Sequence, residues 1–131
     1  MGHYELTILL HPYKLVKIEE LIAPYLELIN RSGSLLGIEN WGKRNLAYSI
    51  DKLLKANYIY LKFQTSKVEI IEELNKDLRF DPIVIRKLLI KVTDTEYKAS
   101  ELMDDDLTSS LKKSLNLKED EEKDVKGLQD D

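Results

Sequence analysis

The stretch NYIYLKFQT, residues 57–65, alternates two kinds of side chain along its length. Successive side chains of a β-strand point to opposite faces, so one face of this stretch would carry Ile59, Leu61 and Phe63. The opposite face would carry Tyr58, Tyr60, Lys62 and Gln64. The period of two predicts a strand with one buried face.

Patterns on both sides of this strand predict the other elements. Ser66 and Glu69 have capping-box spacing and are followed by apolar residues at helical intervals, which predicts a second helix that ends before residues 79–82. The remaining predicted elements are a strand over 3–10, a helix over 14–31, a long strand over 35–51, a connection at 53–55 and a strand over 83–92. The run Leu88-Leu89-Ile90 predicts that the last strand is an inner one.

The predicted order is strand, helix, strand, strand, helix, strand. Two split βαβ units in this order are typical of the α+β class, and specifically of a ferredoxin-like β-α-β-β-α-β sandwich. Such a domain has a four-stranded antiparallel sheet with two helices on one face. The other sheet face is left free and is the expected binding surface.

The segment NWGKRNLAYSI, residues 40–50, combines a tryptophan, two adjacent cations and a tyrosine on the long strand. The alternation of side chains between the two strand faces shifts by one residue here, and a β-bulge near residues 40–42 would explain the shift. Cations neutralise phosphate and aromatic rings stack on bases or pack on a partner, so this composition favours RNA or protein binding. The alternative is an ordinary strand with solvated cations and a half-buried tryptophan.

The charge of the chain is divided unequally. The whole chain of 131 residues has a net charge of −4, but residues 1–93 carry +3 and residues 94–131 carry −7. We therefore expect a domain over 1–95 and an acidic, disordered C-terminal tail over 96–131. The sequence has no cysteine, no apolar run near the roughly 18 residues of a membrane span and no secretory signal. A soluble cytosolic protein, or a processed organellar one, is expected.

No catalytic constellation stands out. His3 and His11 flank the first predicted strand and lie about 26 Å apart in an extended chain, too far to share a metal ion. There is no phosphate-binding glycine loop and no nucleophile elbow. The loop at residues 11–14 lacks the arginine that an acylphosphatase-like enzyme would need. We expect no enzyme activity, cofactor, small-molecule substrate or membrane association.

The strand order also matches the RNA-recognition motif, which needs a basic residue, a glycine and alternating aromatic residues on its third strand. Residues 55–63 lack the glycine, and their aromatic residues are shifted by one position. Tyr58 and Tyr60 still share the free face. Cover for a half-exposed sheet, or a protein interface, is favoured for them over base stacking.

Three segments carry a more specific pattern. The first is His3-Tyr4-Glu5, and the second is Glu39–Tyr58, with the order acidic–x–Trp–Gly–basic–basic–x–Leu–Ala–Tyr–x–Ile at its start. The third is Phe80-Asp81 with Val84–Lys87. The pattern covers about residues 1–95 and resembles the bacterial small-subunit ribosomal protein six family. The chain departs from the family at Gly2-His3, where members often have an arginine, and at Ser49, where many have proline.

The resemblance implies a ferredoxin-like fold and a non-enzymatic role as a constituent of the small ribosomal subunit, on cytoplasmic or organellar ribosomes. Family members pair with small-subunit ribosomal protein eighteen and bind the central domain of small-subunit ribosomal RNA during assembly. The alternative function is a ferredoxin-like protein-interaction or single-strand RNA-binding module outside the ribosome.

The candidate residues follow from their positions in the pattern. Candidate RNA contacts are Lys43, Arg44, Arg86 and Lys91. Candidate partner contacts are Trp41, Leu46, Tyr48, Tyr58 and Tyr60.

Overall fold

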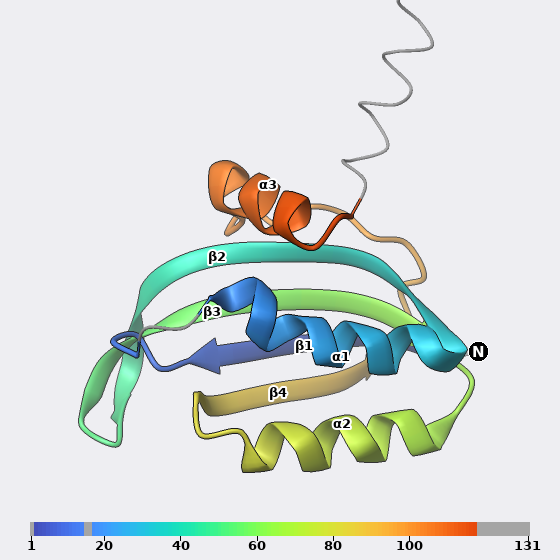
Figure 1. Cartoon of the computed structure of the whole chain (residues 1–131), viewed down its shortest axis with the longest axis horizontal. Coiled ribbons are helices and arrows are strands. Elements are labelled where there is room, and N and C mark those ends of the chain that lie inside the picture. The colour runs from blue at the N-terminus through green and yellow to red at the C-terminus, as the bar shows by residue number, and fades with distance from the viewer. Residues whose placement is uncertain (1, 15–16, 118–131) are drawn as a thin grey trace, which may run out of the picture.

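A computed structural model describes residues 2–14 and 17–117 of the chain (Figure 1). The elements are β1 (Gly2–Leu10), α1 (Ile18–Ser32), β2 (Gly33–Ile50), β3 (Leu53–Thr65), α2 (Val68–Phe80), β4 (Val84–Val92) and α3 (Asp105–Ser114). The first six occur in the predicted order. The seventh, α3, was not part of the predicted fold.

The four strands form one antiparallel sheet with the order β2-β3-β1-β4. Helices α1 and α2 cover one face of this sheet, which we call the helical face (Figure 1). The opposite face is called the open face. This arrangement confirms the predicted ferredoxin-like α+β sandwich.

The core lies between the sheet and the two helices. Leu61 of β3 pairs with Leu6 of β1 and with Ile38 of β2, so three buried side chains cross the sheet in one row. Helix α1 contributes Ile22 and Ile29 to this core, and α2 contributes Leu74 and Leu78. Burial of each such side chain stabilises the fold by about 1.5–3 kcal/mol. The alternation read in residues 57–65 thus places the core on the predicted face of β3.

The predicted bulge in β2 is confirmed. The pairing of β2 with β3 shifts between Asn40 and Gly42, which leaves Trp41 as the extra residue. Gly42 has φ +78°, a left-handed conformation that glycine adopts without steric cost. Ile38, before the bulge, lies on the helical face, and Trp41 lies on the open face, as Glu39 does two residues earlier.

The connection between β2 and β3 is shorter than predicted. Ile50 pairs with Leu53, and the two residues between them, Asp51 and Lys52, have φ values of 50° and 66°. This is the backbone of a two-residue hairpin turn. The prediction of a connection at residues 53–55 was therefore wrong, because these residues already belong to β3.

Two helix starts also differ from the predictions. The described part of α1 begins at Ile18, after the predicted start at residue 14, and residues 15–16 lie outside the described residues. Helix α2 begins at Val68 with Lys67 at its N-cap and no side-chain cap hydrogen bond. Ser66 does not form the predicted capping box, because Thr65 Oγ1 accepts the hydrogen bond from Lys67 N at 3.2 Å.

Strand β4 lies at an edge of the sheet, so the prediction of an inner strand was wrong. Leu88 and Ile90 are 58% and 42% exposed, and both pair with open-face residues of β1. The run of apolar residues reflects an exposed apolar strip on the open face rather than cover on both sides.

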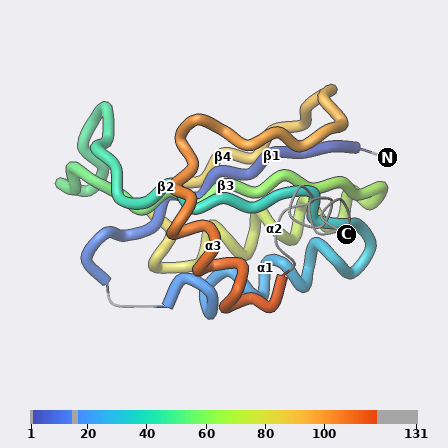
Figure 2. Tube along the Cα trace, turned by 90° about the horizontal axis from the view of Figure 1, so that it is seen from above, coloured from blue at the N-terminus to red at the C-terminus, as the bar shows by residue number. Residues whose placement is uncertain are grey.

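The chain after β4 crosses the open face and then passes the β2 edge (Figure 2). We call residues 93–104 the strap. Helix α3 follows the strap and packs beside β2 and α1. Leu111 is only 4% exposed, and Leu115 and Leu117 pack against the same core.

The prediction of disorder after residue 95 is therefore wrong over 105–114. Asp104 caps α3 by accepting a 2.9 Å hydrogen bond from Leu107 N. The charge density of this region is high, but its few leucines share one helical face that finds a tertiary partner. Residues 118–131 of the predicted tail lie outside the described residues, and the domain boundary after residue 95 stays a prediction.

Candidate nucleic-acid and partner interface

Three aromatic side chains lie together on the open face. Trp41 stacks on Tyr60 with ring centroids 5.6 Å apart and on Tyr58 at 6.1 Å. Tyr58 and Tyr60 come from alternate positions of β3. The fold therefore brings together three of the five candidate partner contacts, and we call these three residues the ring group.

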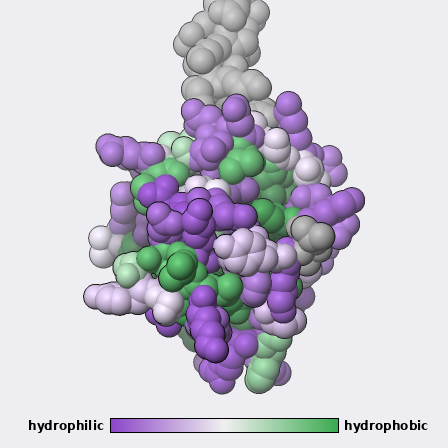
Figure 3. Space-filling model, turned by 90° about the vertical axis from the view of Figure 1, so that its left-hand side faces the viewer, coloured by the Kyte–Doolittle hydropathy of each residue, from purple (hydrophilic) through white to green (hydrophobic). Residues whose placement is uncertain are grey.

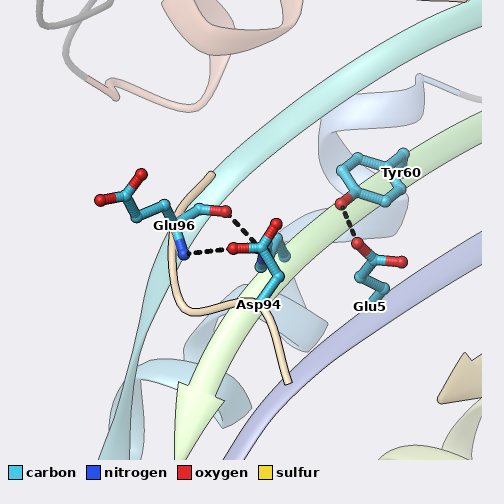
Figure 4. Close-up of polar contacts among 5 residues, drawn as sticks. Glu5, Tyr60, Asp94 and Glu96 are labelled. Atoms are coloured by element: carbon cyan, nitrogen blue, oxygen red, sulfur yellow. Dashed lines mark hydrogen bonds and ion pairs between the residues drawn. The ribbon is translucent and has the colours of Figure 1, made fainter. Parts of the chain in front are cut away.

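A carboxylate of β1 holds Tyr60 in this group. The hydroxyl of Tyr60 donates a 3.0 Å hydrogen bond to Oε2 of Glu5 (Figure 4). Burial, and then this hydrogen bond, raises the pKa of Tyr60 above its ordinary value. The hydrogen bond to Glu5 and the stacking on Trp41 hold the ring in place.

Cations gather on the far end of the β2–β3 hairpin, which projects beyond the rest of the sheet (Figure 1). Residues 43–55 hold Lys43, Arg44, Lys52 and Lys55 against a single acid, Asp51. All four cations are exposed. With Asp51 included, residues 43–55 have a net charge of +3, which equals the net charge of residues 1–93, so the rest of this body is neutral overall. Figure 3 views this end of the molecule and shows mainly hydrophilic side chains around smaller apolar patches.

The two predicted RNA contacts on the hairpin lie in different surroundings. Nζ of Lys43 lies 5.2 Å from the centroid of the Tyr13 ring, which is within the range of a cation–π contact. Arg44 is exposed, and within residues 2–14 and 17–117 it has no hydrogen bond or ion pair. Both cationic groups are accessible to an anionic ligand.

Leu46 and Tyr48 lie where the hairpin loses its regular pairing. Asn45 pairs with Lys55 and Ile50 with Leu53, so four residues of β2 face one residue of β3 between these pairs. Tyr48 is 86% exposed, whereas Leu46 is partly buried. These two candidate partner contacts are therefore on the hairpin, apart from the ring group.

The two candidate RNA contacts of β4 lie on opposite faces of the sheet. Arg86 pairs with Leu9 of β1 and lies on the open face. Lys91 pairs with Tyr4, whose ring stacks on the core residue Phe63, so Lys91 lies on the helical side. The fold does not bring these two cations together.

The strap fastens onto two buried charged residues that sequence reasoning did not single out. Glu39 and Lys62 are 0% and 2% exposed, although both lie on the open face. Oε2 of Glu39 accepts hydrogen bonds from the Tyr97 hydroxyl at 2.5 Å and from Ser100 N at 3.0 Å. Nζ of Lys62 donates to the carbonyl oxygen of Glu96 at 2.6 Å. In the sequence, these two residues could be noticed only as charged residues two positions from Trp41 and Tyr60, on the strand face that carries the ring group.

Asp94 adds an ion pair to the same contact. Its Oδ1 lies 3.9 Å from Nζ of Lys62 and accepts a hydrogen bond from Glu96 N at 3.0 Å (Figure 4). The hydrogen bond from Glu96 and then the Lys62 ammonium hold the pKa of Asp94 below its ordinary value. The strap thus presents anionic and carbonyl oxygens to Lys62.

The part of the chain that the structure describes holds no group of three or more side chains able to bind a metal ion. Within the same residues, no helix is long and apolar enough to cross a membrane.

The chain matches the family model described as ribosomal protein S6 over residues 3–91. It is 39% identical over 92 residues to the small ribosomal subunit protein bS6 of Blochmanniella floridana, covering 70% of this chain and 76% of that protein. The chain belongs to the ribosomal protein S6 family. This is a family of structural proteins of the small ribosomal subunit, not of enzymes.

A solved structure supports the same fold. The 30S ribosomal protein S6 of Thermotoga maritima superposes with a TM-score of 0.59 at 23% identity, over 86% of this chain and 96% of that chain. The ribosomal protein S6 match includes the ring group and the hairpin but ends at residue 91. The strap and α3 lie beyond the residues that the family model matches.

Proposed function

We propose that this chain binds the central domain of small-subunit ribosomal RNA together with small-subunit ribosomal protein eighteen, during assembly and in the translating subunit. The observation that carries the RNA part is the hairpin. Its four exposed cations account for the net positive charge of residues 1–93 and project beyond the sheet. A concentrated charge of this kind suits a few phosphates at one RNA junction.

The limited charge favours a cooperative binder. Each phosphate that a protein neutralises changes the logarithmic salt slope of binding by about 0.7–0.9. Two or three such contacts, opposed by the acidic residues 94–131, give weak binding by the chain alone. A partner protein would supply more cations and more buried surface.

The partner contacts proposed here are on the hairpin and on the open face. Tyr48 is 86% exposed on an irregular part of the hairpin, and exposed aromatic residues are frequent anchors of protein interfaces. Leu46 lies two residues before it, and the ring group offers a second aromatic surface. Lys43 and Arg44 are the main proposed RNA contacts, and Arg86 and Lys91 would add to them from separate faces.

The test measures binding of the heterodimer with ribosomal protein eighteen to a fragment of the central domain of the RNA. The change Lys43→Glu with Arg44→Glu should weaken this binding by at least tenfold, about 1.4 kcal/mol. The matched control is Lys76→Glu with Arg79→Glu, which makes the same charge change at exposed positions of α2. Equal affinities of the two variants would contradict the proposed site.

A second measurement tests the assembly role. Tagged chain in cell extract should sediment with small ribosomal subunits, and Tyr48→Ala should weaken pairing with ribosomal protein eighteen without lowering the stability of the fold. Sedimentation only as free protein would contradict the proposal and favour a module that acts outside the ribosome.

A further inference from the structure

We propose that the open face around Lys62 and the ring group, which the proposed function gives to the partner protein in the heterodimer, binds single-stranded RNA when the chain is alone, and that the acidic strap occupies this face as an intramolecular competitor. The inference rests on the proposed RNA-binding function and adds a surface away from the hairpin. It starts from one cation, Lys62, whose ammonium is buried on a sheet face that the helices leave uncovered.

The strap contacts Lys62 with acceptor oxygens, and the phosphates of an RNA backbone would also offer acceptor oxygens to this ammonium. The ammonium donates a 2.6 Å hydrogen bond to the carbonyl oxygen of Glu96 and lies 3.9 Å from Oδ1 of Asp94. The strap, residues 93–104, holds four acids and one lysine, a net charge of −3. This segment therefore resembles a short anionic strand laid over the sheet.

The surface beside Lys62 has the composition of a single-strand RNA site. Lys62 is two residues from Tyr60 on the same face of β3, and Tyr60 stacks with Trp41. Proteins that bind single strands combine cations that contact phosphates with aromatic rings that stack on bases. A strand of RNA crossing the sheet from the ring group would reach Lys62 at the place where the strap now lies.

The contacts of the strap with the body are few and polar, apart from one ring. Tyr97 packs on Gly37, where an added Cβ would lie 2.3 Å from the Tyr97 ring. Its hydroxyl and Ser100 N bond to Glu39, and most other side chains of the strap are exposed. Segments with few buried apolar contacts open at low free-energy cost.

Glu39 links the strap to the ring group. One oxygen of its carboxylate binds Tyr97 and Ser100, and the other accepts a 2.8 Å hydrogen bond from Trp41 Nε1. Opening of the strap therefore changes the surroundings of Trp41, which is the only tryptophan in the sequence. Its fluorescence reports on the strap without any added label.

The experiment uses the full chain and a labelled oligouridylate, with binding followed by fluorescence anisotropy at low salt. Tyr97→Ala removes the ring from Gly37 and the bond to Glu39. If the closed strap is about ten times more populated than the open strap in the wild type, this variant should bind oligouridylate about tenfold more tightly. Trp41 fluorescence should change in the free variant. Thr95→Ala, at an exposed strap position, is the control and should leave both readouts unchanged.

A second variant separates release of the surface from simple loss of repulsion. Adding Lys62→Met to Tyr97→Ala should abolish most of the gain, because the exposed ammonium is the proposed phosphate contact. An unchanged affinity in Tyr97→Ala, or a gain that survives Lys62→Met, would overturn the inference. Tyr97→Phe keeps the ring on Gly37 and should give a smaller gain, which covers the case in which Tyr97→Ala fails to fold.

These outcomes are distinct from those of the proposed function. Failure of ribosomal RNA binding would appear as equal affinities of the hairpin variant and its α2 control in the heterodimer. Failure of the strap inference would appear in the binding of oligouridylate to the chain alone, as an unchanged affinity in Tyr97→Ala or as a gain that survives Lys62→Met.

Discussion

The indole N–H of Trp41 donates a 2.8 Å hydrogen bond to the carboxylate of Glu39, two residues earlier on the same strand. Glu39 is fully buried, and its other oxygen accepts two further hydrogen bonds from the strap. A single carboxylate thus joins the ring group to the chain that follows β4.

Glu39→Gln should destabilise the protein. The three donors occupy both oxygens of the carboxylate, so the amide nitrogen of glutamine would face a donor instead of an acceptor. A buried group left without its partner costs about 1–3 kcal/mol, which should appear in the free energy of unfolding by urea. Glu72→Gln, at an exposed position of α2, should stay within about 0.5 kcal/mol of the wild type. Equal stability of the two variants would show that the Glu39 contacts contribute little.

Leu111→Ala tests whether α3 is part of the folded domain. Leu111 is 4% exposed against the core, so the truncation should cost about 2–5 kcal/mol. Leu107 lies on the same helix but is 41% exposed, and Leu107→Ala should cost no more than about 1 kcal/mol. Chemical denaturation of both variants gives the comparison. Similar small losses would mean that α3 adds little to the stability of the domain.

Gly42→Ala tests the β2 bulge. A left-handed residue with a Cβ costs about 1–2 kcal/mol, and the φ of Gly42 is +78°. The new Cβ would also lie 3.1 Å from Cδ1 of Leu107. If the backbone conformation dominates, the loss should persist when Gly42→Ala is made in the Leu107→Ala background. If the stability loss caused by Gly42→Ala disappears in that background, the cost comes from the contact with the Leu107 side chain instead.

Alkaline pH should weaken the fold through two tyrosines. Burial, and then the 2.7 Å hydrogen bond from its hydroxyl to Asp81, raises the pKa of Tyr25 above the ordinary value of 10.0, and the pKa of Tyr60 is raised similarly. The folded state then holds these protons more tightly than the unfolded state does. Their contribution is fully present below pH 10.0 and is lost as pH rises above it.

The measurement is the free energy of unfolding as a function of pH on the alkaline side. The double variant Tyr25→Phe with Tyr60→Phe should lose stability less steeply above pH 10.0 than the wild type. Tyr13→Phe, at an exposed position, should follow the wild-type slope. Identical slopes for all three proteins would contradict the assigned pKa directions.

Local patterns were sufficient for most of the fold. The alternation at residues 57–65 placed Ile59, Leu61 and Phe63 in the core, and the phase slip near Trp41 predicted the bulge. The hairpin turn at Asp51-Lys52 was missed because its second residue, Lys52, is not a usual left-handed turn former, although aspartate tolerates that conformation. The position of β4 at the sheet edge was also missed. An apolar run does not show whether a strand has neighbouring strands on one side or on both.

The candidate interface was predicted only as a set of residues. The sequence identified the cations and rings of residues 40–50, but pairing across strands was needed to bring Trp41 onto Tyr58 and Tyr60. The same pairing separated Arg86 from Lys91. Contacts between residues far apart in the chain have no local signature, because they depend on the order of strands in the sheet.

The sequence by itself determined the order of the first six elements, the buried face of β3 and the concentration of positive charge at residues 43–55. These follow from side-chain period and composition, which are properties of neighbouring residues. Only the tertiary structure decided that the acidic segment after β4 lies over Glu39 and Lys62 and that α3 packs on the core. The physical reason is that a segment rich in charge folds only where its few apolar and hydrogen-bonding groups meet partners supplied by the rest of the chain.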